Sequence, residues 1–287
     1  AQPVLAALAY QTLFRSTILP PAPHPAPLRR LRRFGENGLV LCDRFRPSGR
    51  RHPDLGPARR QVGAQGCVRR HMSLDRPPLG MRLSDAFGAW AIRRLAREIV
   101  VEGIERIPKE GPVILVGNHI SWLDPIFLAC WLTPETGRAI NWMGKAEAMR
   151  WPLVGTFLRV NGVFGVRRGA ADLEAFRLAE GVLRDGNVLG IYPEGTRSHD
   201  GKIGTFRDGA ALLALRSGAP VIPVAVSGTE QLWPRGALLP RRAARIQMVI
   251  GEPRRFTYSA GDRPALSLVA EQMRAAVATL LPHEYRP

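Results

Sequence analysis

Short apolar runs and amphipathic stretches alternate along residues 81–287. Runs of apolar residues bounded by Gly, Pro or polar positions are typical of strands buried on both faces. Such runs predict strands over 99–103, 113–116, 139–143, 160–166, 188–191, 221–226 and 246–250. Between them, apolar positions at helical spacing predict helices over 84–98, 125–132, 173–183, 206–217 and 264–281. The alternation predicts an α/β fold: a mixed, largely parallel sheet covered by helices on both faces.

Three local signals refine this pattern. Ser84 is the expected N-cap of the first helix, with Asp85 in its first turn. Trp151 and Pro152 predict a turn. Pro223 lies within a predicted strand, and because proline has no N–H to donate, we expect an edge strand or an irregular position there.

Residues 1–80 have a different composition. Residues 1–71 hold 13 arginines and 3 acidic residues, together with many prolines and little periodicity. This composition indicates a basic Pro/Arg-rich extension that is disordered or artefactual, or else a tether for lipid head groups or RNA. Met72 and Met81 are both candidate start residues, and we place the folded domain at residues 81–287.

Composition narrows the class of protein. The net charge of +17 suits an anionic membrane surface, a phosphorylated substrate, an acidic carrier or nucleic acid. Three scattered cysteines, Cys42, Cys67 and Cys130, are too few for a disulfide framework or a zinc site and favour a reducing compartment. No run of eighteen apolar residues occurs, so no transmembrane helix is expected.

The first candidate chemical cluster follows the apolar run 113–116. His119 comes at the end of the predicted strand, and Asp124 lies about one turn further on, where its carboxylate can reach back to the imidazole. An imidazole oriented in this way can act as a general base near neutral pH. Ser121 is interpreted as a helix N-cap rather than a nucleophile, since no Gly-x-Ser-x-Gly elbow is present. We therefore expect direct deprotonation of a substrate hydroxyl that attacks a thioester; a structural His–Asp pair is the alternative.

The second candidate cluster is residues 192–198, which follow another apolar run. Its sequence is Tyr-Pro-Glu-Gly-Thr-Arg-Ser. Gly195 permits close backbone approach, and Arg197 is suited to bidentate phosphate contacts. Arg168, just past another predicted strand, is a third candidate, and Lys145 and Arg207 are weaker candidates that are otherwise interpreted as surface charges. The cluster predicts an anion-binding surface on the same sheet edge as His119.

Four segments resemble conserved blocks of one family. The His-x₄-Asp pair resembles the motif of the glycerolipid acyltransferases, and above all of bacterial 1-acylglycerol-3-phosphate (lysophosphatidate) acyltransferases. Residues 162–169, Gly-Val-Phe-Gly-Val-Arg-Arg-Gly, are similar to the second block, and residues 192–198 to the third, which usually starts with Phe where this chain has Tyr192. Residues 221–224, Val-Ile-Pro-Val, resemble the fourth. The resemblance covers about residues 99–255.

This resemblance implies roles for individual residues and a glycerol-3-phosphate acyltransferase-like fold. His119 would be the general base and Asp124 the residue that orients it. The acceptor's phosphate would be surrounded by Arg168, Glu194 and Arg197, with Gly195 and Thr196 in the same loop. Because a carboxylate does not bind phosphate directly, we expect Glu194 to hold arginines or to shape the loop.

The implied reaction moves a fatty acyl group from acyl-CoA or acyl-carrier protein to the free hydroxyl of 1-acylglycerol 3-phosphate, giving phosphatidic acid. It needs no cofactor or metal besides the acyl donor, and it implies a peripheral or monotopic protein on the cytoplasmic face of a membrane. Glycerol 3-phosphate or a lyso-aminolipid are alternative acceptors. A different alternative is a non-catalytic basic module that binds nucleic acid or membrane, supported mainly by residues 1–71; the acyltransferase hypothesis expects no nucleic-acid partner.

Overall fold

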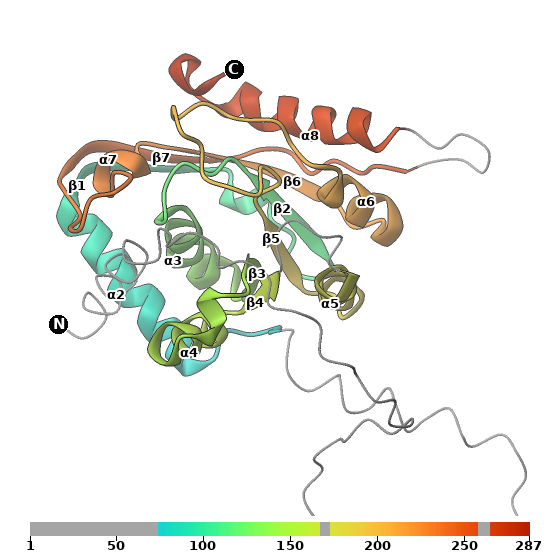
Figure 1. The fold of residues 1–287 in the computed structure, drawn as a ribbon, viewed down its shortest axis with the longest axis horizontal. Coiled ribbons are helices and arrows are strands. Elements are labelled where there is room, and N and C mark those ends of the chain that lie inside the picture. The colour runs from blue at the N-terminus through green and yellow to red at the C-terminus, as the bar shows by residue number, and fades with distance from the viewer. Residues whose placement is uncertain (1–73, 167–172, 258–264) are drawn as a thin grey trace, which may run out of the picture. The chain divides into compact units, whose positions relative to one another are not determined.

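The computed structural model describes residues 74–166, 173–257 and 265–287, which belong to one compact unit of the chain (Figure 1). The predicted N-terminal extension therefore lies outside the described residues except for its last seven positions. Leu74 and Asp75 already join the fold: the Leu74 N–H donates to Asn141 Oδ1 at 2.9 Å, and Asp75 O accepts from the Ala139 N–H at 3.1 Å.

A seven-stranded sheet with the order β1-β7-β6-β2-β5-β3-β4 forms the middle layer. Every neighbouring pair is parallel except β6 and β7, which are antiparallel. The strands are β1 (Ala96–Glu102), β2 (Val113–Gly117), β3 (Ile140–Lys145), β4 (Val163–Val166), β5 (Val188–Ile191), β6 (Val221–Ser227) and β7 (Ala243–Ile250). The predicted mixed, largely parallel sheet is confirmed.

Helices cover both faces of the sheet, because successive side chains of a strand point to opposite sides. In β2, Ile114 and Val116 pack in the core beneath α5, α6 and α8, whereas Val113 and Leu115 pack with α2 and α3 on the other face (Figure 1). The α-helices are α2 (Leu79–Leu95), α3 (Asp124–Thr136), α4 (Pro152–Val160), α5 (Leu173–Arg184), α6 (Asp208–Ser217), α7 (Thr229–Leu232) and α8 (Leu266–Leu280). The short 3₁₀ helices are η3 (Ile104–Arg106), η4 (Ala148–Arg150) and η5 (His283–Tyr285).

The predicted start of the first helix is wrong. Helix α2 begins at Leu79 directly after Pro78, so Ser84 lies in its second turn and is not an N-cap. The Ser84 hydroxyl instead donates to Met81 O at 2.9 Å and contacts Asn161 Oδ1 at 2.6 Å. That second contact ties α2 to the end of α4.

The predicted turn at Trp151 and Pro152 is the start of a helix. Pro152 occupies the first helical position of α4, where a missing N–H costs no hydrogen bond. The apolar residues of this helix, with Val160 at its end, caused the next strand to be predicted three residues too early. Strand β4 begins only at Val163, after a turn at Gly162 with φ of 72°.

Pro223 lies in a central strand, so its predicted edge position is wrong and the alternative, an irregular position, is correct. Strand β6 has β2 on one side and β7 on the other. Val221 pairs with Arg254 and Val224 with Ile250. The segment from Ile250 to Arg254 therefore spans four residue steps, whereas the opposing segment of β6 spans three. The extra residue is a bulge opposite Pro223, where the regular ladder needs no N–H.

Candidate active site

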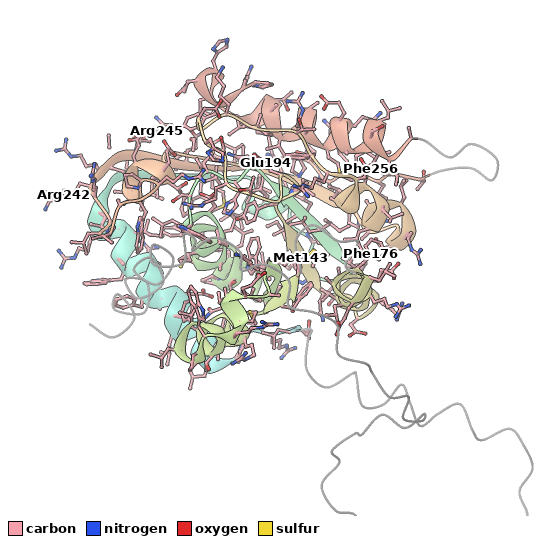
Figure 2. All side chains as sticks on the ribbon, viewed as in Figure 1. Met143, Phe176, Glu194, Arg242, Arg245 and Phe256 are labelled. Carbon is pink, nitrogen blue, oxygen red and sulfur yellow. The ribbon has the colours of Figure 1, made fainter. Side chains whose placement is uncertain are left out.

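The two polar clusters meet at one edge of the sheet. Strands β2 and β5 are parallel neighbours, with Val116 opposite Ile191, so the loops that follow them emerge side by side. Figure 2 shows Glu194, from the second loop, among the interior side chains, whereas Arg242 lies at the rim. The prediction that both clusters share a sheet edge is confirmed.

His119 and Asp124 form a buried pair. His119 Nδ1 lies 2.8 Å from Asp124 Oδ2, with the imidazole 12% exposed and the carboxylate fully buried. Since a carboxylate accepts hydrogen bonds, Nδ1 carries the proton and the lone pair remains on Nε2. No described residue forms a hydrogen bond with Nε2. The predicted contact is confirmed, and the catalytic role of the pair stays a prediction.

Four donors surround the Asp124 carboxylate. Oδ2 accepts from His119 and from the backbone N–H groups of Ile120 at 2.7 Å and Ser121 at 2.8 Å. Oδ1 accepts from the Thr229 hydroxyl at 2.5 Å. Asp124 is also the first residue of α3, where the helix dipole favours a negative charge. This environment supports a buried anion that holds the imidazole in one orientation.

Ser121 does not cap α3, because the residue before the helix is Leu123 and no side chain caps it. The Ser121 hydroxyl lies 3.3 Å from Trp233 O and accepts the Leu123 N–H at 3.3 Å. Both contacts are buried, so Ser121 joins the His119 loop to the segment after α7.

Aromatic rings stack against the imidazole. The Tyr192 ring lies 4.3 Å from the His119 ring at an interplanar angle of 17°, and the Trp142 ring lies 5.5 Å from Tyr192 at 8°. Glycines at 117 and 190 leave room for this stack, since a side chain at Gly190 would collide with Trp142. Burial raises the pKa of Tyr192, and the nearby Asp124 charge raises it further. The Tyr192 hydroxyl is therefore neutral, and it has no hydrogen-bond partner among the described residues.

Glu194 joins the two loops through backbone groups. Its Oε1 accepts the His119 N–H at 3.0 Å and its Oε2 accepts the Gly204 N–H at 3.1 Å, while the Ser198 N–H donates to His119 O at 2.7 Å. Burial raises the pKa of Glu194, and the two N–H donors partly offset this effect. Of the two expectations for Glu194, these contacts match the one in which it shapes the loop.

A largely apolar cavity of about 950 Å³ opens at His119. It extends between the inner faces of α2, α3 and α4 and also toward α5 and α6. His119, Tyr192 and Gly195 line it where the strands end, together with Lys145 and Arg207. A cavity of this size and polarity suits alkyl chains with a polar reacting group at the strand ends.

The predicted anion-binding residues have different surroundings. The Arg197 guanidinium lies over the Trp122 ring, 4.3 Å from its centre. Gly195 has φ of 70° and lines the cavity, whereas Thr196 is exposed. Arg168 lies outside the described residues, so its predicted phosphate contact stays a prediction.

Arg207, a weaker candidate otherwise interpreted as a surface charge, is exposed, and its side chain also reaches the site. Its Nε lies 3.1 Å from the position that a Cβ on Gly195 would occupy, and the residue lines the cavity. A larger residue at Gly195 would displace this guanidinium. Its position just before α6 carried no signal of this contact in the sequence.

Two residues that position the pair received no role from the sequence. The Asn118 amide donates to Val226 O and accepts the Val226 N–H, both at 2.8 Å, and so fastens the His119 loop to β6. Thr229 contacts Asp124 from 105 positions further along the chain. The Ser-Gly-Thr sequence at 227–229, two residues after the fourth block, was the only available signal, and it resembles an ordinary turn.

Comparison with known proteins agrees with this geometry. Residues 98–227, which contain the His119 loop, the Glu194 loop and β6, match the model of the acyltransferase family. These residues are therefore similar to the acyltransferase family, as the resemblance implied.

Two curated relatives have more specific names. A 1-acyl-sn-glycerol-3-phosphate acyltransferase from Borreliella burgdorferi is 36% identical over 143 residues, which cover 47% of this chain and 54% of the relative. A lyso-ornithine lipid O-acyltransferase from Pseudomonas aeruginosa is 36% identical over 155 residues, which cover 53% of this chain and 56% of the relative. The chain thus spans about half the length of the curated relatives it matches.

A solved structure shares the fold. The crystal structure of the 1-acyl-sn-glycerophosphate (LPA) acyltransferase PlsC from Thermotoga maritima superposes with a TM-score of 0.56 and 28% identity, covering 70% of this chain and 79% of that chain. The predicted acyltransferase-like fold is therefore confirmed. In the described residues, no helix is both long and apolar enough to cross a membrane.

Proposed function

We propose that this chain transfers a fatty acyl group from a thioester donor, acyl-CoA or acyl-carrier protein, to the free hydroxyl of 1-acylglycerol 3-phosphate. The observation that carries the proposal is the His119–Asp124 contact of 2.8 Å at the mouth of an apolar cavity. The family match over residues 98–227 and the named relatives support the same reaction.

His119 acts as the general base in this mechanism. Its Nε2 takes the proton of the acceptor hydroxyl as the acceptor oxygen bonds to the thioester carbonyl carbon. The C–S bond then breaks, and the departing thiolate takes the proton from the imidazolium, leaving an ester and a free thiol. Asp124 stabilises the imidazolium and keeps Nε2 directed at the substrate. No covalent acyl-enzyme and no metal are needed.

The acceptor's phosphate binds near the Glu194 loop in this proposal. Arg197 and Arg207 supply guanidinium groups from that region, and Arg168 is a further candidate from the resemblance. Guanidinium groups bind phosphate through paired N–H donors. Glu194 acts indirectly by holding the loop against His119.

A lyso-ornithine lipid is the second candidate acceptor. Its named acyltransferase in Pseudomonas aeruginosa is as similar in sequence, 36%, as the Borreliella relative, and over a slightly longer stretch. The base mechanism is the same for both acceptors. They differ in charge, because one head group carries a phosphate and the other an amino acid.

Exposed apolar side chains on α2 and α4 support contact with a membrane. They form what we call the α2–α4 surface: Leu79, Leu83, Trp90, Leu153, Phe157 and Val160. Exposed arginines, among them Arg82 and Arg159, lie on the same two helices and suit anionic head groups. We propose peripheral binding through this surface at the cytoplasmic face.

Membrane binding is tested by sedimentation with vesicles containing phosphatidylglycerol. Leu153→Glu on α4 should weaken binding by about 10-fold, because a side chain that enters the apolar layer is lost. Leu268→Glu on α8, which is also exposed, is the matched control and should bind as the native protein does. Equal binding of all three proteins would reject the α2–α4 surface.

An acceptor panel tests the function. The full chain is incubated with acyl-CoA or acyl-carrier protein donors and with 1-acylglycerol 3-phosphate, glycerol 3-phosphate or lyso-ornithine lipid in detergent. We expect the highest kcat/KM with 1-acylglycerol 3-phosphate and about a 10²–10⁴-fold lower kcat for His119→Ala, whose circular dichroism should be unchanged. Equal turnover by His119→Ala would remove the base assignment, and a preference for lyso-ornithine lipid would select the second candidate.

A further inference from the structure

We propose that Thr229 is a positioning residue for the His119–Asp124 pair and that Tyr285, in the C-terminal η5, holds the Thr229 loop in place. This inference rests on the proposed function for its effect on turnover. The contacts that carry it involve β6, α7 and η5, which come from outside the two loops that hold the predicted catalytic residues.

The Thr229 hydroxyl completes the surroundings of the Asp124 carboxylate. Its Oγ1 donates to Oδ1 at 2.5 Å, and both residues are fully buried. The other carboxylate oxygen, Oδ2, faces His119 and two backbone N–H groups. With a donor on each side, the carboxylate cannot turn about its Cβ–Cγ bond without losing buried hydrogen bonds, each of which is costly to leave unmade.

The turn directly before Thr229 requires glycine at position 228. Gly228 has φ of 82°, and a Cβ at this position would collide with Arg245 O, so only glycine fits the turn that ends β6. Thr229 then starts α7, and its carbonyl accepts the Trp233 N–H at 3.1 Å. The turn therefore delivers the hydroxyl to Asp124 from a fixed direction.

Tyr285 fastens this turn from the C-terminal η5. Its hydroxyl accepts the Gly228 N–H at 3.1 Å and donates to Glu230 Oε1 at 2.8 Å. Burial and the adjacent Glu230 raise the pKa of Tyr285 to about 12, so the hydroxyl stays protonated and remains a donor at neutral pH. Its two hydrogen bonds engage residues on both sides of Thr229.

The same C-terminal residue also reaches the second loop. The Tyr285 carbonyl accepts the Ile203 N–H at 3.0 Å, and the next N–H along the chain, that of Gly204, donates to Glu194 Oε2 at 3.1 Å. Glu194 in turn accepts the His119 N–H. Tyr285 therefore links the segment that orients Asp124 to the segment that supports the His119 backbone.

The test compares Thr229→Val, which keeps the shape and removes the hydroxyl, with Thr229→Ser, which keeps the hydroxyl. In the full chain we expect Thr229→Val to lower kcat by about 10–100-fold, with both KM values within about 2-fold, because only the orientation of the base is impaired. Thr229→Ser should restore kcat to within about 3-fold of the native value. Equal kcat in all three proteins, or a serine variant as slow as the valine variant, would overturn the proposal.

A second readout does not depend on acyl transfer. In protein labelled with ¹⁵N-histidine, the His119 Nδ1–H proton gives a downfield resonance, which is assigned by its absence in His119→Gln. We expect Thr229→Val to broaden or abolish this resonance and Tyr285→Phe to speed its exchange with water by about 10-fold. An unchanged resonance in both variants would refute the positioning role even if the chain proved to transfer no acyl group. The Tyr285→Phe measurement also decides the matter if Thr229→Val does not fold.

The charged and titratable groups near the pair must be considered when pH profiles are compared. Glu194 and Tyr192 face His119, and Asp124 lies beneath it. Thr229 does not titrate. We expect the pH–rate profile of Thr229→Val to differ from that of the native protein, whereas Thr229→Ser, the control, should keep the native profile.

Discussion

Asp124 and Asp85 are both buried, Asp124 against His119 and Asp85 in the wall of the cavity that His119 lines, and their surroundings are opposite. Asp124 is fully buried and receives four hydrogen bonds from His119, two backbone N–H groups and Thr229. Asp85, on α2, is 4% exposed, yet its Oδ2 has no partner at hydrogen-bonding distance among the described residues. The supply of donors, rather than burial itself, distinguishes a carboxylate that serves the site from one that destabilises the fold.

The lack of donors around Asp85 is accompanied by a raised pKa. Burial raises its pKa to about 6, and the nearby Thr133 hydroxyl offsets only part of this effect. Asp85 lines the apolar cavity from the face of α2 that packs on α3. The carboxylate that is held by donors thus contacts His119, whereas the carboxyl group without such support lies on the cavity wall.

Removing the charge of Asp124 gives the largest expected effect. In Asp124→Asn the amide oxygen can replace Oδ2, and the Thr229 hydroxyl can rotate to accept from the amide N–H, so most hydrogen bonds survive. The imidazolium loses its counter-charge, however, and we expect kcat to fall about 10²–10⁴-fold. Steady-state kinetics and urea unfolding of the same preparation measure the two effects separately.

The comparison fails if the stability of Asp124→Asn falls while kcat is retained. In that case Asp124 would be a structural cap of α3 and the His–Asp pair would have no catalytic role. Asp85→Asn, assayed alongside, is the matched control and should keep kcat within about 3-fold, because Asp85 contacts neither His119 nor the backbone that holds it.

Asp85→Asn should instead raise stability, and only above about pH 4. The pKa of Asp85 is about 6 in the folded state and near 3.8 in the unfolded chain. Ionising Asp85 therefore destabilises the folded state increasingly as pH rises from about 4 to about 6. The penalty is complete above that window and absent below it. We expect Asp85→Asn to be more stable than the native protein by about 1–3 kcal/mol at pH 8 and equal to it near pH 4.

Urea unfolding at pH 4, 6 and 8 measures this dependence. Cys130, whose pKa is raised by its own burial and then by Asp85, is the closest other titrating group on α3 and stays neutral across the range. If the difference in free energy of unfolding between Asp85→Asn and the native protein does not depend on pH, Asp85 has a hydrogen-bond donor in solution.

The sequence predicted the site better where its residues are close along the chain. His119 and Asp124 are five positions apart, and the end of an apolar run was enough to place one beside the other. The Glu194 loop was placed correctly because parallel neighbouring strands end at the same edge of a sheet. The function of the Glu194 carboxylate depends on backbone N–H groups, which leave no mark on side-chain identity.

Contacts between distant segments escaped prediction for a physical reason. Thr229 is an ordinary turn residue until β6 is known to lie beside β2, which brings it to Asp124. Helix α4 was missed because Trp151 and Pro152 signal a turn and a helix start equally well. In each instance local preference was ambiguous and tertiary packing decided the outcome.

Tyr192→Phe should give the smallest effect and extends the comparison to a neutral group. The Tyr192 hydroxyl is buried without a partner among the described residues, whereas the Tyr285 hydroxyl makes two hydrogen bonds. Removing the Tyr192 hydroxyl should leave the free energy of unfolding unchanged or raise it by about 1 kcal/mol. Removing the Tyr285 hydroxyl should lower it by about 1–3 kcal/mol. The aromatic stack on His119 does not need the hydroxyl, so kcat of Tyr192→Phe should stay within about 2-fold. If kcat falls more than about 10-fold while stability is unchanged, the Tyr192 hydroxyl contacts the substrate, and its missing partner is the acyl donor or acceptor itself.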